Sequence, residues 1–362
     1  MIPVTKVFLP PIEEYQAILQ RAWDKGWITN RGELVLELEE KLKFYLQTEH
    51  ILITNNGTIP LQIAIKALDL KGEIITTPFS YVATTSSIVW ENCQPVFVDI
   101  HPEYLTIDET QIEAAITSRT TGIMATHVFG NPCDVETIEA IAQKYGLKVI
   151  YDAAHCFGVR YKGQSIFNFG DVSTCSFHAT KLFHTGEGGA LFARDKALQH
   201  KLYYSHNFGH NGPLDFYGLG INGKISELQA AMGLAVFPYL ETILASRKKV
   251  IAAYDKELAG LPLQKLKIRP GTEWNYSYYP VIFENEALLL ETQDLLNQND
   301  VFPRRYFYPS LGNLNYVVKT PTPRADGVAS RVFCLPLYHN MSEAEQLLVV
   351  NILQHVQKVA WL

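Results

Sequence analysis

A regular alternation between residues 51 and 152 constrains the fold of this chain more than any other sequence feature. Short apolar runs with the length of buried strands alternate with segments whose apolar residues recur at the spacing of a helix face. The predicted strands cover residues 51–54, 73–78, 95–99, 122–127 and 148–152, and the helices between them include residues 82–91, 109–117 and 134–145. Strands joined by helices pair in parallel, so we expect an α/β fold with a mainly parallel sheet covered on both faces.

The later part of the chain has a different pattern. Its predicted elements are a long helix that starts near residue 227, strands at 276–283 and 332–337, and helices at 286–298 and 342–357. A chain of 362 residues is also long for a single core. We therefore predict a large domain over residues 1–245 and a smaller C-terminal α+β domain over residues 246–362.

Composition excludes several classes of partner. The net charge of −6 leaves no polybasic surface, so we expect neither nucleic acid nor membrane as a partner. We find no signal-peptide pattern and no run that approaches the roughly 18 apolar residues of a membrane span. The five cysteines are scattered without metal-ligand spacing and no histidine pair suggests a metal, so we expect reduced thiols in a cytoplasmic protein without a metal.

Asp152 and Lys181 are the pair of residues that most directly suggests chemistry. Asp152 ends the predicted strand 148–152, and Lys181 follows about thirty residues later. Pyridoxal phosphate (PLP) needs a lysine amine to condense with its aldehyde and a carboxylate that keeps its pyridine nitrogen protonated. Each residue alone is weak, because a lone lysine is usually a solvated surface charge and an aspartate at a strand end is often a cap.

Other residues occur in the order that the same cofactor requires. The turn at Gly57 and Thr58 opens a helix and suits a phosphate, although it also suits a plain cap. Tyr81 is either a ring that stacks on a flat cofactor or a core aromatic residue. Ser176 either reaches the phosphate or bonds its own backbone. The glycines of the run 186–189 would allow the backbone next to the lysine to come close to a bound ligand, where side chains would collide with it.

Taken together, these residues resemble the DegT/DnrJ/StrS family of sugar aminotransferases, a branch of the fold-type I PLP enzymes. The resemblance runs nearly end to end. Its motifs are Gly26-Trp-Ile-Thr-Asn30, Asn56-Gly-Thr58, Pro78-Phe-Ser-Tyr-Val-Ala-Thr84, Pro95-Val-Phe-Val-Asp99, His127-Val-Phe-Gly-Asn-Pro132, Asp152-Ala-Ala-His155, residues 176–189 and Asn222-Gly-Lys-Ile-Ser-Glu-Leu-Gln-Ala-Ala231. It implies a seven-stranded, mainly parallel sheet in the large domain, PLP as the cofactor, and a homodimer with shared active sites.

The resemblance also implies residue roles. Lys181 and Asp152 would be catalytic, and the cofactor-binding residues would be Gly57, Thr58, Tyr81, Asp152, His155, Ser176, Lys181 and Asn222. Asn222 matches an asparagine that relatives extend into the neighbouring subunit's site. Lys224 stands where relatives commonly carry an arginine, so a bidentate contact made by that arginine is not expected here.

The substrate is suggested by the sequence around the lysine. His178-Ala-Thr-Lys181 followed by Gly186-Glu-Gly-Gly189 resembles the subgroup that aminates the C4 ketone of dTDP-4-keto-6-deoxyglucose with L-glutamate as the donor. Relatives that act at C3 tend to carry Tyr-Pro-x-Lys and Gly-Asp-Gly-Gly. The predicted substrate-binding residues are Thr29, Asn30, His184, Arg304, Arg305, Tyr306 and Tyr308. Either arginine alone is as readily a solvated surface charge.

Three alternatives remain at this stage. Amination at C3, or of a UDP-linked sugar, uses the same residues and is separable only with a panel of substrates. A PLP-dependent sugar dehydratase carries histidine at the lysine position, so Lys181 argues against it. A non-catalytic binding protein on the same scaffold would show loss of Asp152 or Lys181, and both are present. The nucleotide and the stereochemistry of the new amine stay open.

Overall fold

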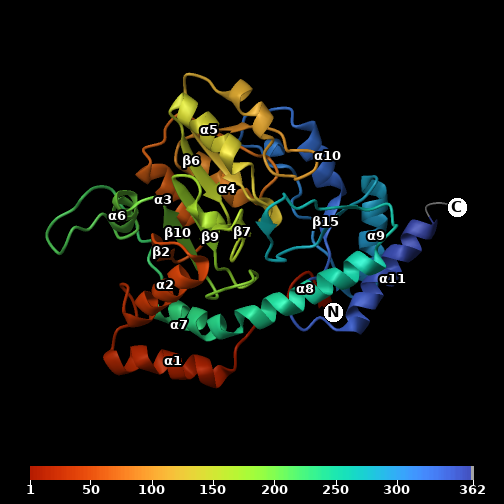
Figure 1. Cartoon of the computed structure of the whole chain (residues 1–362), viewed down its shortest axis with the longest axis horizontal. Coiled ribbons are helices and arrows are strands. Elements are labelled where there is room, and N and C mark those ends of the chain that lie inside the picture. Colours follow the sequence, from red (N-terminus) through yellow and green to blue (C-terminus); the bar gives the residue numbers. More distant parts are fainter. Residues whose placement is uncertain (360–362) are drawn as a thin grey trace.

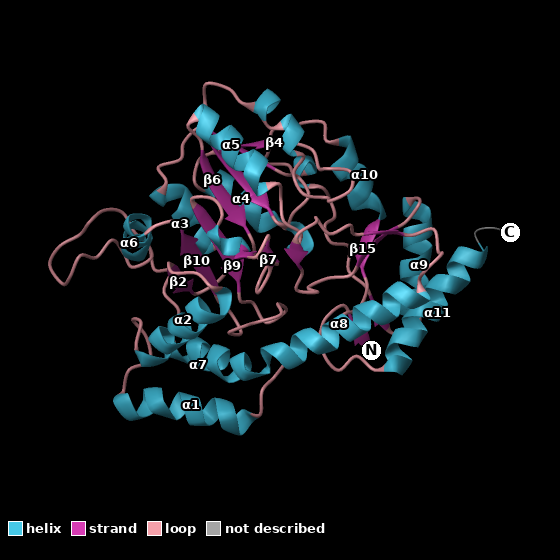
Figure 2. Cartoon of the chain, viewed as in Figure 1, coloured by secondary structure: helices cyan, strands magenta, loops and turns pink. Residues whose placement is uncertain are grey.

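A seven-stranded sheet forms the centre of the larger part of the protein (Figures 1 and 2). The computed structural model describes residues 1–359, with side chains as far as residue 356. In spatial order the strands are β2 (Ile51–Thr54), β10 (Gly189–Ala193), β9 (Val172–Ser176), β6 (Lys148–Asp152), β5 (Thr120–Thr126), β3 (Glu73–Thr76) and β4 (Gln94–Phe97). Only β10 runs antiparallel to its neighbours. The predicted α/β class with a mainly parallel sheet is confirmed.

Helices cover both faces of this sheet because its strands are apolar on both sides. Ile51 and Ile53 of β2 pack on one face with α2 (Glu33–Leu46), α5 (Val135–Tyr145) and α7 (Glu227–Val236). Leu52, between them, packs on the other face with α3 (Ile59–Ala67), α4 (Val82–Trp90) and α6 (Lys196–Ser205). Successive side chains of a strand point to opposite faces, so one short apolar run serves two cores. The N-terminal helix α1 (Ile12–Lys25) lies along α7 (Figure 1).

A second core lies in the C-terminal part of the chain. Helix α8 (Leu240–Glu257) leads into it, with Ile243 in the first core and Val250 in the second. Its other elements are α9 (Glu286–Gln298), α11 (Glu343–Val359) and the sheet of β11 (Gln264–Lys265), β13 (Pro280–Ile282) and β15 (Val332–Cys334). Strand β1 (Ile2–Pro3) pairs with β14 (Val301–Phe302), so the N-terminal residues pack here as well. The domain boundary at 245/246 stays a prediction, which the change of core along α8 supports.

Two smaller contacts tie the parts together. Strand β12 (Thr272–Glu273) pairs with β7 (Arg160–Tyr161), which also pairs with β8 (Gln164–Ser165). Helix α10 (Pro323–Arg331) begins where the carboxylate of Asp99 accepts hydrogen bonds from the backbone amides of Arg324 and Ala325, at 2.9 and 2.8 Å. The C-terminal part is thereby anchored at the same edge of the sheet as the residues discussed below.

One helical run is long and apolar enough to span a membrane by length and composition alone. It covers residues Glu227–Glu257, which comprise α7, a 3₁₀ turn at Phe237–Tyr239, and α8. Its residues Ala230 and Leu234 pack in the first core, and Val250 and Tyr254 pack in the second. Packing within the protein therefore accounts for its apolar character.

Two predicted elements differ from the structure, and several elements were missed. The helix predicted at 109–117 is wrong, because this stretch forms two 3₁₀ turns, Glu109–Gln111 and Glu113–Ala115. Its first turn is tightened where the Asp108 carboxylate accepts from the Thr110 amide, and the buried Glu109 lies 3.5 Å from Arg269. The strand predicted at 276–283 shrinks to Pro280–Ile282, since Tyr276 has a φ of 56°, which a strand does not allow. Helices α1, α6 and α10 and strand β10 were not predicted.

Candidate active site

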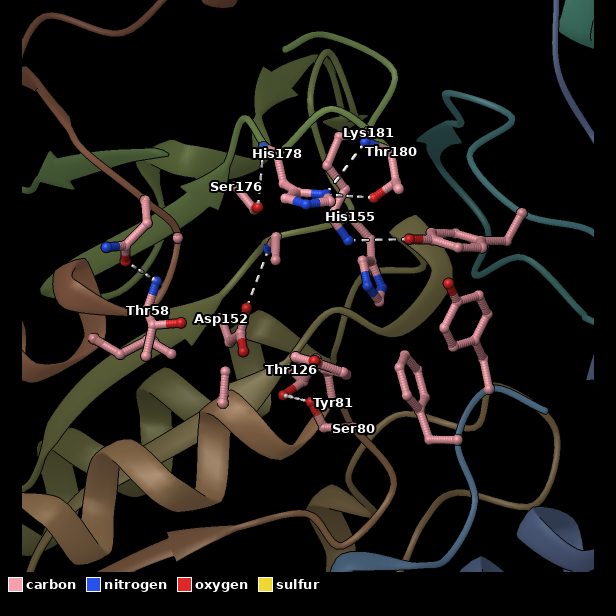
Figure 3. Close-up of a pocket in the computed structure, with 18 of the residues that line it drawn as sticks. Thr58, Ser80, Tyr81, Thr126, Asp152, His155, Ser176, His178, Thr180 and Lys181 are labelled. Carbon is pink, nitrogen blue, oxygen red and sulfur yellow. Dashed lines mark hydrogen bonds between the residues drawn. The ribbon is translucent and has the colours of Figure 1, made fainter. Parts of the chain in front are cut away.

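Polar side chains gather at the carboxyl edge of the sheet, around a cavity of about 250 Å³ (Figure 3). Asp152, Ser176 and Thr126 are the last residues of β6, β9 and β5, while Thr58 and Tyr81 follow β2 and β3. Parallel strands end on the same side, so these residues converge although they are far apart in the sequence. The C-terminal part closes the cavity with Tyr278, Arg304, Tyr306 and Phe307.

Lys181 lies in the loop between β9 and β10, beside the cavity. The loop is fastened by backbone hydrogen bonds, from the amide of Phe177 to the carbonyl of Gly188 at 2.8 Å and from Ala179 to Gly186 at 2.7 Å. The next two side chains, Leu182 and Phe183, are buried in the core. The lysine amine donates a hydrogen bond to the hydroxyl of Tyr278 at 3.1 Å (Figure 3). The backbone under Lys181 is therefore fixed, and its amine is directed into the cavity.

The glycines beside the lysine are required by the chain itself. A Cβ at Gly189 would lie 2.3 Å from the carbonyl oxygen of Asn56, and one at Gly188 would lie 2.0 Å from the Thr185 hydroxyl. A collision within the protein therefore accounts for these two glycines, and the predicted collision with a bound ligand stays a prediction. Glycine is required at position 57 for the same reason, because a Cβ there would lie 2.7 Å from the Cβ of Ser176. Because Gly57 has no side chain, the turn after β2 can approach the end of β9.

Asp152 is a buried carboxylate, 5% exposed, at the inner end of the cavity. One oxygen accepts from the backbone amide of Ala154 at 3.1 Å and the other from the Thr84 hydroxyl at 2.6 Å. Thr84 in turn contacts Ser80 at 2.7 Å, and Ser80 accepts from Thr126 at 3.1 Å. Burial raises the pKa of the Asp152 carboxyl, and the hydrogen bonds partly offset this. A protonated pyridine nitrogen would supply the positive charge that stabilises the carboxylate here.

His155 lines the cavity near Lys181 (Figure 3). Its Nδ1 accepts a hydrogen bond from the backbone amide of Phe129 at 3.1 Å, which assigns the proton to Nε2. Burial, together with the charge of Lys181, holds the pKa of His155 well below its usual value. The ring is parallel to that of Phe307 within 3°, with the centroids 5.7 Å apart. His155 is therefore a neutral, fixed donor facing the cavity.

The turn after β2 presents hydroxyl and amide groups at the opposite end of the cavity. Thr58 and Ser176 both line it, with Gly57 between them. In this structure the Asn56 side chain accepts from the backbone amides of Thr58 and Ile59, each at 2.8 Å. Two amides at the start of α3 thus have a partner within the chain. The hydroxyls of Thr58 and Ser176 remain as donors suited to a phosphate.

The structure brings together nine of the predicted site residues in the lining of this cavity: Gly57, Thr58, Tyr81, Asp152, His155, Ser176, Lys181, Arg304 and Tyr306. The other predicted residues lie elsewhere: Thr29, Asn30, His184, Asn222, Arg305 and Tyr308. His184 is buried, and its ring nitrogens contact the carbonyl of Phe8 at 2.7 Å and the amide of Gly186 at 3.2 Å. Its polar atoms are thus occupied by backbone groups.

The two neighbouring arginines have different surroundings. Arg304 lines the cavity with its guanidinium 5.1 Å from the centre of the Tyr306 ring, and it makes no ion pair within residues 1–356. Arg305 points the other way, where it contacts Glu286 at 2.7 Å and the carbonyl of Ser330 at 2.8 Å. Only Arg304 is therefore in a position to meet an anion in the cavity.

Sequence reasoning missed several contributors to the site, among them the hydrogen-bond partners of Lys181 and Asp152. Tyr278, the hydrogen-bond partner of Lys181, comes from a stretch that the sequence predicted to be a strand. Thr84, the partner of Asp152, lies in the motif 78–84 but has no local feature that marks it. The available signal for Thr84 was its place in the first turn of the helix predicted at 82–91, close to Tyr81.

The lysine amine, the buried carboxylate and the hydroxyls, all at the carboxyl edge of an α/β sheet, define a PLP-dependent aminotransferase of fold type I. The chain belongs to the DegT/DnrJ/EryC1/StrS aminotransferase family, whose model matches residues 11–354. It is 41% identical over 346 residues to the dTDP-4-amino-4,6-dideoxy-D-glucose transaminase of Shigella dysenteriae, with 94% of each chain covered. The Escherichia coli enzyme of the same description is 38% identical, with 94% of this chain and 95% of the relative covered.

A solved structure gives the same fold. The structure described as DesI in the presence of its TDP-sugar product superposes with a TM-score of 0.94 at 30% identity. The superposition covers 99% of this chain and 93% of the other. The family, the fold and the cofactor expected from the sequence are confirmed by these similarities, whereas the roles of the individual residues remain predictions.

Proposed function

We propose that this protein transfers the amino group of L-glutamate to the C4 ketone of dTDP-4-keto-6-deoxy-D-glucose and so makes dTDP-4-amino-4,6-dideoxy-D-glucose. The observation that carries the proposal is the Lys181–Asp152 pair on one cavity, in a chain 41% identical to a relative described by that product. The TDP-sugar product named with the similar solved structure also supports a thymidine nucleotide.

Lys181 is the residue to which we assign the proton transfer. Bound PLP would supply an electron-accepting ring, and Asp152 would keep the pyridine nitrogen protonated. The Lys181 amine would take the proton from the α carbon of glutamate and deliver it to the cofactor, which keeps the amino group while 2-oxoglutarate leaves. In the second half-reaction the amine would take a proton back from the cofactor and deliver it to C4 of the sugar. A positioned base of this kind contributes about 10²- to 10⁴-fold. The same cavity serves both half-reactions in turn.

The remaining cavity residues hold the reactants. Thr58, Ser176 and Gly57 would bind the phosphate, and Tyr81, which is 54% exposed at the cavity mouth, would cover the ring. Neutral His155 would donate through Nε2 to a cofactor oxygen. Arg304, without an acidic partner of its own in the described chain, would bind the glutamate carboxylate or the sugar diphosphate.

We further propose a homodimer with shared sites, in the cytoplasm and without nucleic acid or membrane as a partner. The loop 207–222 supports the dimer, because it exposes the large apolar side chains of Phe208, Leu214, Phe216, Tyr217 and Leu219. A second copy of the chain would cover them and receive Asn222, which does not line the cavity of its own chain.

The test is incubation with PLP, L-glutamate and a panel of nucleotide keto-sugars, followed by NMR of the product. We expect turnover of the dTDP-linked 4-keto sugar, and a clear preference for a 3-keto or UDP-linked sugar would replace this assignment. Lys181→Ala should lose at least about 10⁴-fold in turnover and lose the visible absorbance of the bound cofactor. Lys162→Ala, which changes a surface lysine paired with Glu136, is the matched control.

A further inference from the structure

The amine of Lys181 has a partner that comes from the C-terminal part of the chain. Its Nζ donates to the hydroxyl of Tyr278 at 3.1 Å, the one hydrogen bond that the amine makes in the described part of the protein. The two residues are 97 positions apart in the sequence. A lysine side chain rotates about four bonds, so an amine without a partner samples many positions. A fixed partner therefore restricts where this amine spends its time.

The backbone before Tyr278 is held from two sides. On one side, Asn275 donates to the carbonyls of His155 and Phe157, both at 2.9 Å, and the Ser277 hydroxyl donates to the carbonyl of His155 at 2.9 Å. On the other side lies Arg247 of α8. These contacts attach the segment 275–278 directly to the turn that carries His155.

Arg247 of α8 holds the same segment by hydrogen bonds to its carbonyl groups. It is 6% exposed, and its guanidinium donates to the carbonyls of Tyr276, at 2.9 Å, and Ser277. Tyr276 has a φ of 56°, a conformation that a tyrosine keeps only where its surroundings impose it. Burial lowers the pKa of Arg247 to about 10, so the guanidinium is still charged at neutral pH. A buried charge is thus used to hold a strained turn.

The ring of Tyr278 is also confined. Its centroid lies 4.7 Å from the His155 ring, 5.6 Å from Phe129 and 5.6 Å from Tyr306, the last in an edge-on arrangement. With both the backbone and the ring held, the hydroxyl has one direction in which to point, and Lys181 lies there.

We propose that Tyr278 is a positioning residue that holds the Lys181 amine at the reacting atoms whenever the amine is not bonded to the cofactor. A phenol hydroxyl accepts from a protonated amine and donates to a neutral one, so it keeps its partner before and after the proton has moved. The tyrosine itself gains and loses no proton. This proposal rests on the assignment of Lys181 to the aminotransferase reaction.

Tyr278→Phe tests the proposal, with Tyr279→Phe as the control. The control removes a hydroxyl from the next residue, which contacts Asp255 at 2.8 Å, away from the cavity. The first measurement is the rate at which the cofactor-free protein acquires the absorbance of bound PLP. We expect Tyr278→Phe to slow this rate about tenfold and the control to match the wild type.

The second measurement is the rate of the glutamate half-reaction. We expect Tyr278→Phe to lower kcat about 10- to 100-fold with an unchanged KM for glutamate, and to increase the isotope effect with α-deuterated glutamate. An unchanged rate of PLP capture together with unchanged kcat would overturn the proposal. If Tyr278→Phe does not fold, Arg247→Lys, which loosens the segment, must reproduce the slower capture or the proposal fails.

The two measurements also separate this proposal from the proposed function. PLP capture needs no sugar and no glutamate. A wild-type protein that captures PLP but aminates no keto-sugar would refute the proposed function, while the difference between wild type and Tyr278→Phe would still report on Tyr278. Normal amination by the wild type with no effect of Tyr278→Phe would refute only the positioning role.

Discussion

The cavity has two sides that are built differently. One side, the strand-end side, consists of Asp152, Ser176 and Thr126 at the ends of β6, β9 and β5. The other, the C-terminal side, consists of Tyr278 and Tyr306 on irregular backbone and of Arg304, which forms a single β-bridge with Cys334. The strand-end residues are positioned by the pairing of neighbouring strands, whereas Tyr278 depends on side-chain contacts to carbonyls far along the chain.

This difference suggests a division of labour. Strand pairing fixes a side chain to within a fraction of an ångström and leaves little room for adjustment, which suits groups that must match one cofactor. Irregular segments that contact the sheet through a few hydrogen bonds tolerate changes more readily, which suits contacts to substrates that differ between relatives. Substitutions on the strand-end side should therefore alter the chemistry. On the C-terminal side, a substitution of Tyr278 should alter the orientation of Lys181, and a substitution of Arg304 should alter the affinity for substrates.

After Lys181→Ala, the largest expected effect comes from Asp152→Asn on the strand-end side. Asparagine keeps the shape of the side chain, and its oxygen can still accept from the Ala154 amide. It lacks the negative charge that would keep the pyridine nitrogen protonated. We expect kcat to fall about 10²- to 10³-fold, measured with saturating glutamate and sugar. Asp152→Asn with wild-type kcat would show that the carboxylate does not act on the cofactor.

The same variant should make the cofactor-free protein more stable. Burial raises the pKa of Asp152, so the charged carboxylate lowers the free energy of unfolding at neutral pH. This destabilisation is lost as the pH falls through the raised pKa and below the pKa of an unfolded aspartate. A neutral asparagine removes the cost, and we expect the melting temperature at pH 7 to rise by about 1 to 3 °C. At acid pH the difference between the two proteins should vanish, and a lower melting temperature at pH 7 would contradict the assigned burial cost.

The two sides also differ in how far the sequence predicts them. Asp152 ends a short apolar run, so a local pattern was sufficient to put it at one edge of a sheet. Tyr278 was missed because its position depends on Arg247 and on the carbonyl of His155, which no local pattern relates to it. The same limit explains the wrong helix at 109–117, where Glu109 is drawn to Arg269. Asn222 is a further case, because its predicted partner belongs to another copy of the chain.

A smaller effect is expected for Asn222→Ala, which extends the comparison to the second subunit. If Asn222 completes the neighbouring site, the substitution should lower activity about tenfold by removing a contact to the cofactor phosphate. Asn211→Ala, on the same loop and bonded to Asp215, is the matched control. Size measurement by light scattering should give a dimer for all three proteins.

Mixing the variants determines which subunit receives Asn222. In a dimer of one Lys181→Ala chain and one Asn222→Ala chain, shared sites place both defects in one site and leave the other intact. Random mixing makes half of the dimers mixed, so about one quarter of the wild-type activity should return. If Asn222 served its own chain's site, the mixture would keep only the residual activity of the Asn222→Ala chains, about one twentieth of the wild-type value, and if it served no site the mixture would keep about one half.

The smallest effects are expected for the two arginines on the C-terminal side, which provide a comparison within one dipeptide. Arg304 faces the cavity without an acidic partner in the described chain, so Arg304→Ala should raise the KM for glutamate or for the sugar about fivefold and leave the melting temperature unchanged. Arg305 is largely buried against Glu286 and the Ser330 carbonyl. Arg305→Ala should therefore cost about 1 kcal/mol of stability with an unchanged KM, measured by thermal unfolding and steady-state kinetics. In the reverse pattern, Arg305→Ala would change the KM and Arg304→Ala would change the stability. That result would mean that this segment changes conformation when substrate binds, so that the C-terminal side of the cavity moves during the reaction.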